Sequence, residues 1–256
     1  MTMLESILKN VYPTEAFRNG CNAMNTSFHT YDDDEGLLYE EDYMDEAVDT
    51  SDASHWGNGV TKVALVFDNY VLKSSITGYV TTTDDEGNYL EEDEIHETFD
   101  RDYCEIEYKV YRKAVATGVG KFFAETISLG DGVYMQEKYD LDFDHGIPEG
   151  MELTGLIKQY YDSEHLVSWA EFHAESLGLL SLYEAIQQNS LLFAWLVTLY
   201  DYNDLAALST FIEEYEINDL HEGNVGWFGH ELKFIDYSGY CSNTPFTLND
   251  KENENG

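Results

Sequence analysis

The hydrophobic pattern of this chain changes near residue 150, and the change limits the folds that the chain can adopt. Before it, short runs of branched and aromatic residues alternate with glycine and aspartate turns, which is typical of β-hairpins. From Leu153 to Tyr215, apolar residues recur at the three- and four-residue spacing of helices. The sequence therefore predicts an α+β protein with a small antiparallel sheet followed by a mainly helical half.

A glycine turn and a single lysine mark the start of the predicted sheet. Gly57 and Gly59 lie in a turn that would let backbone N–H groups approach phosphate oxygens, although a plain turn explains them equally well. Two strands, 63–67 and 70–73, follow, and Lys73 ends the second. Lysine at a strand end is commonly solvated. The low number of basic residues in this chain weakens that explanation somewhat, and Lys73 is a candidate for phosphate binding.

A helix with a carboxylate on its apolar face comes next. Residues 104–116 have helical spacing, and the predicted inward face consists of Glu107, Val110, Tyr111, Ala114 and Val115. A carboxylate on an apolar face is costly unless it is paired. Glu107 is therefore a better partner for Lys73 than Glu105. Residues 118–120 contain two glycines and end the helix.

Two further strands lead into the helical half. Residues 122–129 and 133–139 flank a glycine turn at 130–132. Three groups of apolar residues with helical spacing follow: Leu180, Leu182 and Ile186; Leu191, Leu192, Trp195, Leu196 and Leu199; and Leu205, Leu208, Phe211 and Ile212.

The segment after these helices contains three side chains with oxygen ligands. Asn224 follows Asp219 by five residues, and Asp236 comes after two short strands, 225–228 and 231–235. The hairpin would bring Asn224 and Asp236 to one edge. Mg²⁺ prefers such oxygen ligands. Asp and Asn are also ordinary loop residues, so this spacing alone occurs by chance in many proteins.

The order of these features resembles the protein kinase-like superfamily. The features are the glycine turn, the lysine, the helix with its glutamate, the strands and the loop Asp219-Leu220-His221-Glu222-Gly223-Asn224. The loop is most similar to that of aminoglycoside-phosphotransferase-like kinases and compact bacteriophage serine/threonine kinases. The resemblance spans roughly residues 56–240. It implies a bilobal protein kinase-like fold, with a small antiparallel β N-lobe and a reduced, mainly helical C-lobe.

The resemblance also implies a role for each matching charged residue. Asp219 would be the catalytic residue, and Asn224 and Asp236 would be the Mg²⁺ ligands. Lys73 and Glu107 would form the ion pair that positions the phosphates of ATP.

Further nucleotide contacts follow from the same resemblance. Gly57 and Gly59 would cover the nucleotide. Backbone groups of Gln136, Glu137 and Lys138, in the linker between the lobes, would contact the adenine edge.

We expect four regions on this basis. Residues 1–55 form an acidic N-terminal segment, with a short helix from Met3 to Tyr12. Residues 56–140 form the N-lobe, which contains an acidic surface insertion at about 74–100. Residues 141–243 form the helical C-lobe with the catalytic loop, and residues 244–256 form a disordered tail.

The sequence departs from the kinase pattern in three places. Ile217 stands where a His or Tyr is common, two residues before Asp219. The Asp-Phe-Gly motif reads Asp236-Tyr237-Ser238-Gly239, with the glycine one place late. Residues 240–256 are too few for an Ala-Pro-Glu motif and a late helical platform, so peptide docking and activation-loop control of the usual type are in doubt.

The chain is strongly acidic, with 13 basic residues against 51 acidic ones and a net charge of −38. Such a surface repels nucleic acid and anionic membranes. The acidic residues gather in two runs, 31–46 and 84–94. One explanation is that both runs are solvated loops. The other is that they imitate a phosphate backbone, so that this protein occupies the basic groove of a nucleic-acid-binding protein. Tyrosines within the runs suit protein contact.

The cysteines and the hydrophobic runs bear on the compartment. Cys21, Cys104 and Cys241 are odd in number and widely spaced, which favours a reducing compartment and argues against disulfides or zinc. No apolar run has transmembrane length, and the N-terminus lacks a signal-peptide pattern. We expect a cytoplasmic protein without direct contact to membranes or nucleic acid.

The resulting expectation is an ATP- and Mg²⁺-dependent protein kinase that acts on Ser or Thr. The resemblance suggests that it is encoded by a bacteriophage. The acidic runs suggest that it docks on basic host proteins, in the host cytoplasm, and phosphorylates them. The alternative is an inactive kinase-like or acidic DNA-mimic protein that binds and inhibits a nucleic-acid-binding partner. A small-molecule phosphotransferase ranks third, because the short C-terminal half has no evident substrate-binding subdomain.

Overall fold

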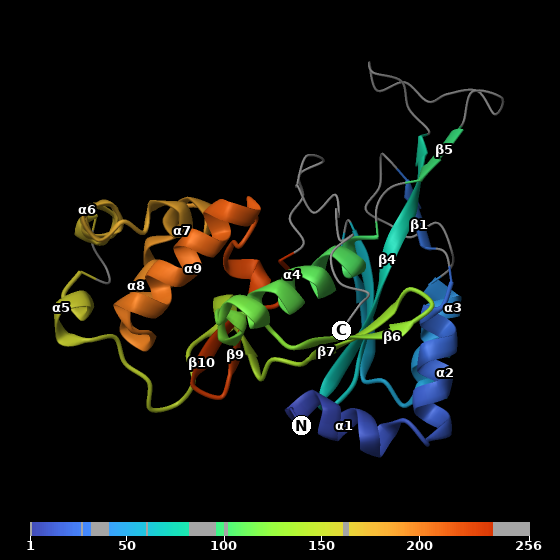
Figure 1. The fold of residues 1–256 in the computed structure, drawn as a ribbon. Coiled ribbons are helices and arrows are strands. Elements are labelled where there is room, and N and C mark those ends of the chain that lie inside the picture. Colours follow the sequence, from blue (N-terminus) through green and yellow to red (C-terminus); the bar gives the residue numbers. More distant parts are fainter. Residues whose placement is uncertain are drawn as a thin grey trace. The chain divides into compact units, whose positions relative to one another are not determined.

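The computed structural model describes residues 2–26, 28–31, 41–59, 61–81, 96–99, 102–160 and 164–237. The protein is a mixed α and β structure whose sheets are largely antiparallel (Figure 1). The chain forms two compact units. Unit 1 contains Met1–Lys109 and Glu125–Lys138, and unit 2 contains Val110–Ala124 and Tyr139–Gly256. Each unit is described by itself.

The sheet of unit 1 is built around one long strand. Its main path runs, in order, through β2 (His55–Asn58), β3 (Lys62–Val66), β4 (Tyr70–Thr81), β7 (Val133–Glu137) and β6 (Thr126–Gly130), with every neighbouring pair antiparallel. This arrangement confirms the predicted small antiparallel sheet.

The second half of β4 extends beyond this path. It pairs in parallel with β1 (Phe28–Tyr31) and antiparallel with β5 (His96–Phe99). Residues 74–81, which we expected to begin the acidic insertion, therefore continue β4. Their content of Ile, Tyr, Val and Thr explains the extended conformation. The run 84–94 lies outside the described residues.

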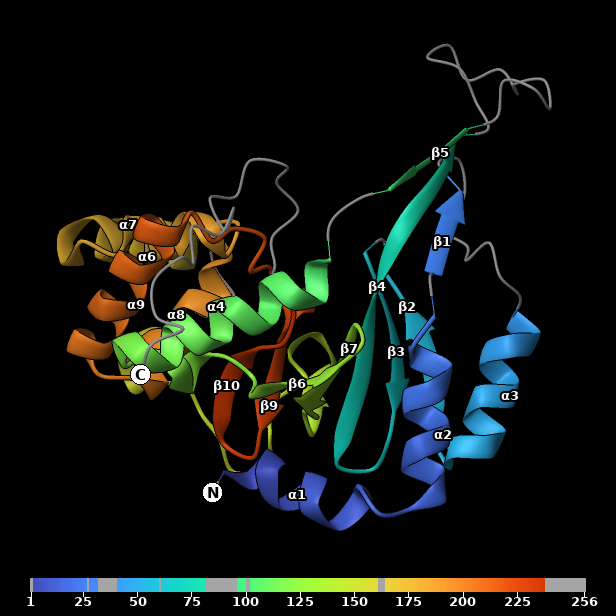
Figure 2. The ribbon, with the colours of Figure 1, turned by 45° about the vertical axis from the view of Figure 1, so that its right-hand side comes forward.

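Three helices pack against the same core as this sheet. They are α1 (Met3–Val11), α2 (Glu15–Met24) and α3 (Glu41–Ser51). Thr2 caps α1 in a capping box with Glu5, and Thr14 caps α2. Figure 2 shows α2 and α3 beside the sheet. The helix predicted from Met3 to Tyr12 is confirmed by α1.

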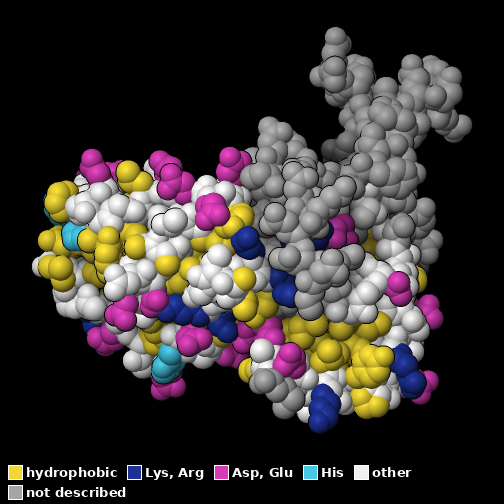
Figure 3. All heavy atoms as spheres, in the orientation of Figure 1, with side chains coloured by type: hydrophobic (Ala, Val, Ile, Leu, Met, Phe, Trp, Pro, Cys, Tyr) yellow, Lys and Arg dark blue, Asp and Glu magenta, His cyan; other side chains and the backbone are white. Residues whose placement is uncertain are grey.

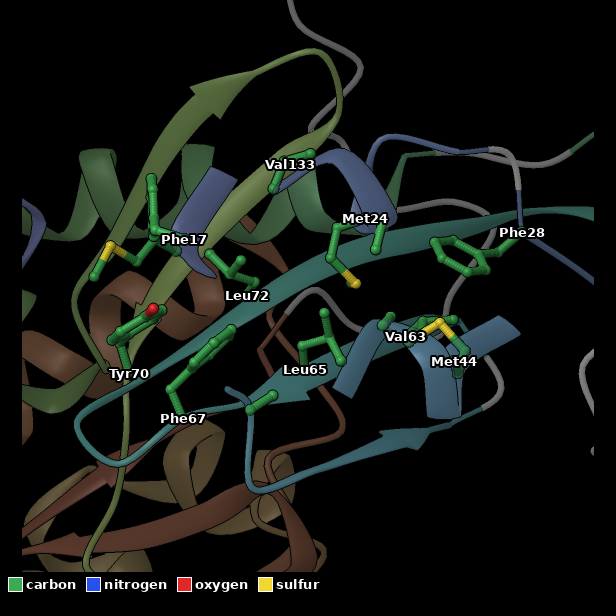
Figure 4. Packing of buried hydrophobic residues seen from close by; sticks show 14 of the residues in the cluster. Phe17, Met24, Phe28, Met44, Val63, Leu65, Phe67, Tyr70, Leu72 and Val133 are labelled. Atoms are coloured by element: carbon green, nitrogen blue, oxygen red, sulfur yellow. The ribbon is translucent and has the colours of Figure 1, made fainter. Parts of the chain in front are cut away.

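The hydrophobic core of unit 1 lies between these helices and the sheet (Figure 4). Alternate strand residues point into it, because side chains of a strand alternate between its faces. The core includes Phe17, Met24, Phe28, Met44, Val63, Leu65, Phe67, Tyr70, Leu72 and Val133. Described residues of α1, α2, β1 and α3 therefore share one core with the sheet, although the sequence suggested a separate acidic segment.

Helix α4 (Tyr103–Thr117) follows β5 along the chain and corresponds to the predicted helix. Gly118, at φ +86°, ends it in the left-handed conformation, and Val119 N–H donates to Ala114 C=O at 2.8 Å. Glu107 and Ala114 are buried as expected. Val115 is 53% exposed, because it lies about 100° around the helix from Ala114.

Unit 2 is mainly helical and holds a small second sheet (Figure 1). Its helices are α5 (Gly155–Lys158), α6 (His165–Leu177), α7 (Leu180–Ala185), α8 (Ser190–Leu199) and α9 (Tyr202–Tyr215), and short 3₁₀ turns lie at Gly120–Phe122, Phe143–His145 and Glu222–Asn224. The three groups of helical spacing between residues 180 and 212 are thus confirmed. The sheet order is β10 (Glu231–Phe234), β9 (Val225–Phe228) and β8 (Leu141–Asp142).

The helices and the sheet of unit 2 meet in an aromatic core. Trp195 of α8 and Trp227 of β9 are almost completely buried, and their rings lie edge to face with centroids 5.4 Å apart. The indole N–H of Trp227 donates to Gly146 C=O at 3.0 Å. The tail 244–256 and Cys241 lie outside the described residues. Within the described part of the chain, no helix is both long enough and apolar enough to cross a bilayer.

Candidate active site

In unit 1, the predicted partners Lys73 and Glu107 form an ion pair. Lys73 lies on β4, and its Nζ is 3.1 Å from Oε1 of Glu107, which lies on α4. Glu107 is only 1% exposed and Lys73 is 13% exposed. Glu105 instead pairs with Lys109 on the helix surface. Burial explains the choice, because a carboxylate that leaves water needs a cationic partner.

A second lysine, which the sequence analysis missed, contacts the same carboxylate. Lys62 Nζ lies 2.9 Å from the other oxygen of Glu107, Oε2, and Lys62 is 6% exposed. The amide of Gln136 donates to Glu107 Oε1 and, at 3.0 Å, to the hydroxyl of Thr126. Donors from β3, β4 and β7 therefore hold one carboxylate of α4.

Small residues border Lys73 on this face of the sheet. Gly57, Ala64 and Lys73 are directly opposite one another across β2, β3 and β4. A Cβ atom added at Gly57 or Gly59 would meet nothing within 4 Å. The Gly59 N–H donates to the Lys62 carbonyl at 2.9 Å and closes the turn between β2 and β3. The backbone of this turn is therefore accessible to a ligand.

The first turn of α4 is fixed by a separate polar cluster. Asp102 Oδ1 accepts hydrogen bonds from Ser75 Oγ at 2.6 Å and from the Glu105 N–H at 2.8 Å. The Ser75 hydroxyl also accepts from the Cys104 N–H at 2.9 Å. Burial raises the pKa of the Cys104 thiol to about 12. This thiol is therefore inert near neutral pH, and the cluster positions α4 and, through it, Glu107.

The three residues expected at the adenine edge have different surroundings. Gln136 is the last residue but one of β7, and its side chain donates a hydrogen bond to Glu107. The Glu137 N–H donates to the Glu125 carbonyl at 2.9 Å. Lys138 follows the last residue of β7. An adenine contact by these backbone groups stays a prediction.

In unit 2, Asp219 lies in a loop between two buried anchors. Helix α9 ends at Tyr215, and Ile217 and Leu220 are 5% and 0% exposed. The Leu220 N–H donates to the Ala185 carbonyl at 3.0 Å, which ties the loop to the end of α7. Asp219 itself has a left-handed backbone, with φ +62°. Burial of Ile217 and Leu220, on either side of Asp219, anchors the loop, and the Asp219 carboxylate stays partly exposed.

Asn224 closes the Asp219 loop. Its side-chain amide group donates to the Asp219 carbonyl at 2.8 Å. The carbonyl can only accept, so the NH₂ group points toward it and the amide oxygen points away. His221 Nδ1 accepts from the Gly223 N–H at 3.1 Å, which leaves the proton of a neutral ring on Nε2, 3.8 Å from Asp219 Oδ1.

The predicted hairpin after Asn224 is present and brings Asp236 back beside the loop. Strand β9 pairs with β10 through Phe234 opposite Val225, and the Ile235 N–H donates to the Asn224 carbonyl at 2.9 Å. Asp236, the next residue, is half-buried. Asn224 and Asp236 therefore lie at the same end of the hairpin. Ser238 and Gly239, the rest of the motif, lie outside the described residues.

A strained turn between α7 and α8 adjoins the loop. Gln187 and Gln188 both have left-handed backbones, with φ +55° and +58°. The Gln187 amide donates to Asp219 Oδ1 at 3.3 Å, and the Asn189 amide donates to the Glu222 carboxylate. Non-glycine residues in this conformation cost about 1–2 kcal/mol each and cluster at functional sites. The sequence offers no signal for this turn.

A cavity of about 470 Å³ opens between this turn and the loop. Its lining is mostly polar and consists of Ile186, Gln187, Asn189, Asp219, His221 and Glu222. The cavity is large enough for one or two side chains or a small molecule. Asp219 could therefore contact a hydroxyl group placed in it.

The described residues offer oxygen ligands for a metal held jointly with a phosphate ligand. No group of three or more His, Cys, Asp or Glu side chains that could hold a metal occurs in the described ranges. Mg²⁺ in nucleotide sites commonly takes only one or two protein oxygens, together with phosphates and water. The outward amide oxygen of Asn224 and the carboxylate of Asp236 fit that requirement.

Comparison of the chain with protein-family models, with curated protein sequences and with solved structures gives no match.

Proposed function

We propose that the protein is an ATP- and Mg²⁺-dependent protein kinase that phosphorylates Ser or Thr, and that its two compact units are the lobes of a kinase-like fold. The observation that carries the proposal is the buried pair of Lys73 and Glu107, which joins a strand and a helix in the order that phosphotransfer by a kinase requires. The glycine turn joins β2 to β3, and Lys73 lies on the next strand, β4. Lys73 is therefore on the third strand of the series β2, β3 and β4, as a kinase requires.

In this proposal, the residues of unit 1 bind the nucleotide. Lys73 would contact the α- and β-phosphates while Glu107 holds its ammonium group in place. The β2–β3 turn, with Gly57 and Gly59, would cover the phosphates with backbone N–H groups. Gly57 and Ala64 support this role, because residues this small leave room beside Lys73.

The residues of unit 2 would align the acceptor. Asp219 would orient the acceptor hydroxyl and take its proton, while Asn224 and Asp236 would hold Mg²⁺. When bound, Mg²⁺ would neutralise charge on the β- and γ-phosphates. The hydrogen bond from Asn224 to the Asp219 carbonyl supports this division of roles, because it fixes the distance between the proton acceptor and a metal ligand. The proposal requires both sets of residues to serve one nucleotide.

The acceptor side chain would enter the cavity beside Asp219. The net charge of −38 would attract basic proteins through long-range electrostatics. We therefore propose basic host proteins as substrates, in the host cytoplasm, with a bacteriophage as the source of the chain.

A second candidate function is favoured by the same charge. An inactive kinase-like protein could occupy the basic groove of a nucleic-acid-binding protein and inhibit it. Such a protein would not need the ionised groups of Asp219 or Asp236.

The test is phosphate transfer from γ-labelled ATP with Mg²⁺, alone and with a host-cell lysate, for wild type, Asp219→Ala and Asp236→Ala. Asp144→Asn, an exposed carboxylate in the same unit, is the matched control. We expect label transfer that falls by about 10²–10⁴-fold in the Asp219 variant and persists in the control.

Absence of transfer from wild type would contradict the kinase proposal. If all variants then captured a basic DNA-binding protein equally well, and displaced DNA from it, the mimic would become the preferred function.

A further inference from the structure

We propose that Lys62 is a second lysine for the phosphate groups of the nucleotide, acting beside Lys73. This inference rests on the proposed function, because it adds a ligand to the same nucleotide. It starts from the observation that two lysines share one buried carboxylate, one on each oxygen of Glu107.

The strand register puts both lysines on one face of the sheet. Lys62 is opposite Ser75, and Ala64 is opposite Lys73, so the two lysines are diagonal neighbours across β3 and β4. Their ammonium groups lie 2.9 and 3.1 Å from the two oxygens of Glu107. A ligand that reaches one ammonium group along this face is therefore close to the other.

The energetics favour a role beyond holding α4. Lysine is rarely buried, because its ammonium group loses hydration, and Lys62 is only 6% exposed. Glu107 already receives Lys73 and the Gln136 amide on Oε1. Both lysines contact the same carboxylate. Ammonium groups form charge-assisted hydrogen bonds with phosphate oxygens, so a nucleotide phosphate beside Lys73 could also contact Lys62.

Lys62 also ends the turn that would cover the phosphates. Its carbonyl accepts the Gly59 N–H at 2.9 Å, so its side chain starts at the base of that turn. The backbone at Gly57 and Gly59 has open space above it. The turn and Lys62 are thus adjacent, and Lys73 lies on the next strand on the same face, so backbone and ammonium groups, which are the groups that bind phosphate, lie near one another.

The test compares the affinities of wild type and variants for ATP, ADP, AMP and adenosine, each measured by titration calorimetry with Mg²⁺. For Lys62→Met and for Lys73→Met, we expect ATP affinity to fall roughly 10- to 100-fold. The affinity for adenosine should stay within about twofold, since adenosine has no phosphate. Lys109→Met, which removes a lysine paired on the exposed side of α4, is the matched control and should bind ATP as wild type does.

A double variant separates direct phosphate contact from an effect through Glu107. If Lys62 contacts phosphate, Lys62→Met should lower ATP affinity further when Lys73 is already Met. If Lys62 only holds Glu107 in place for Lys73, the second substitution will change nothing in that background, and the inference is overturned. ATP binding by wild type and Lys62→Met with equal affinity would also overturn it while leaving the proposed function intact. A wild-type protein that binds no ATP would overturn both.

A second measurement uses wild type alone, in case Lys62→Met does not fold. An acyl phosphate of ATP transfers its acyl group to amines beside the terminal phosphates. We expect acylation of both Lys62 and Lys73, detected by mass spectrometry of peptides and suppressed by excess ATP. Acylation of Lys73 without Lys62 would overturn the inference.

Discussion

The carboxylate of Glu107, on α4, is only 1% exposed and forms ion pairs with two lysines of the sheet, Lys62 and Lys73. Removal of one member of a buried ion pair leaves the other charges buried without compensation. Glu107→Ala should therefore lower the free energy of unfolding by about 3–5 kcal/mol. Urea unfolding followed by circular dichroism measures this change.

Glu105→Ala is the matched control for that experiment. Like Glu107, Glu105 pairs with a lysine, but its partner is Lys109 of the same helix and Glu105 is 47% exposed. An exposed pair contributes about 0–1 kcal/mol, so this variant should unfold almost as wild type does. Equal losses in both variants would show that burial of the Glu107 pair adds no stability.

The sequence predicted the partner of Lys73 because Glu107 was the carboxylate on the apolar face of its helix. It did not predict Lys62 as a second partner, since a lysine next to a glycine turn has the pattern of an exposed residue. The role of the Gln136 side chain was also missed. These contacts join β3 and β7 to α4, elements that are distant from one another in the sequence, and local spacing does not indicate which distant elements meet.

At the scale of elements, the turn between α7 and α8 combines strain with a contact to Asp219. Gln187 and Gln188 have the same left-handed backbone, but the structure shows an Asp219 contact only for the Gln187 side chain. Gln188→Gly should raise the free energy of unfolding by about 0.5–1 kcal/mol and leave phosphate transfer unchanged. Gln187→Gly should relieve the same strain but lower the transfer rate about tenfold, because one hydrogen bond to Asp219 is lost.

Thermal unfolding and the rate of label transfer, measured on both variants, separate strain from function. If the two glycine variants had the same transfer rate, Gln187 would have no role in positioning Asp219.

The β2–β3 turn allows a cleaner separation of binding from stability. A Cβ atom added at Gly57 or at Gly59 would have no neighbouring atom within 4 Å. Gly57→Ala and Gly59→Ala should therefore change the free energy of unfolding by less than about 0.5 kcal/mol. We expect KM for ATP to rise about tenfold, because a methyl group would keep phosphate oxygens away from the backbone. Unchanged KM in both variants would remove the turn from the proposed site.

Elements with local signals were predictable, whereas those that depend on distant partners were not. The hairpins β3–β4, β6–β7 and β9–β10 each consist of neighbouring strands joined by a short turn. The parallel pairing of β1 with β4 joins residues about fifty positions apart, and no local pattern indicates it. Helix α3 is acidic, with a narrow apolar stripe that includes Met44 and Ala47, which gives a weak helical signal.

At the scale of the whole molecule, two thiols make unit 1 sensitive to alkali. Burial raises the pKa of Cys21 to about 11 and that of Cys104 to about 12, from an ordinary value of 9.0. Above pH 9 the unfolded chain loses these protons while the folded chain keeps them. Stability is therefore fully present below pH 9 and falls as the pH rises toward the folded values.

The thermal midpoint should decline between pH 9 and 11, measured by calorimetry under reducing conditions. Cys21→Ala and Cys104→Ala should each reduce this decline. A midpoint that does not change over that range would contradict the assigned burial of the thiols.

The net charge should make the thermal midpoint rise with salt concentration. A protein held together by surface ion pairs would show the opposite change. At −38, repulsion between like charges opposes the compact state. The sparse dark blue and frequent magenta on the visible face illustrate this imbalance (Figure 3). Raising the ionic strength from about 0.01 M to about 0.15 M shortens the Debye length from about 30 Å to about 8 Å, so the thermal midpoint should increase.

The perpendicular pair of Trp195 and Trp227 gives unit 2 an optical reporter. Trp227 lies three residues after Asn224 and is shielded from water by Trp195 and Phe143. Its fluorescence should be blue-shifted and insensitive to quenchers such as iodide. A ligand that reorients the Asp219 loop would change the environment of this indole, so the emission of a variant without Trp56 and Trp169 can follow events at the site in real time.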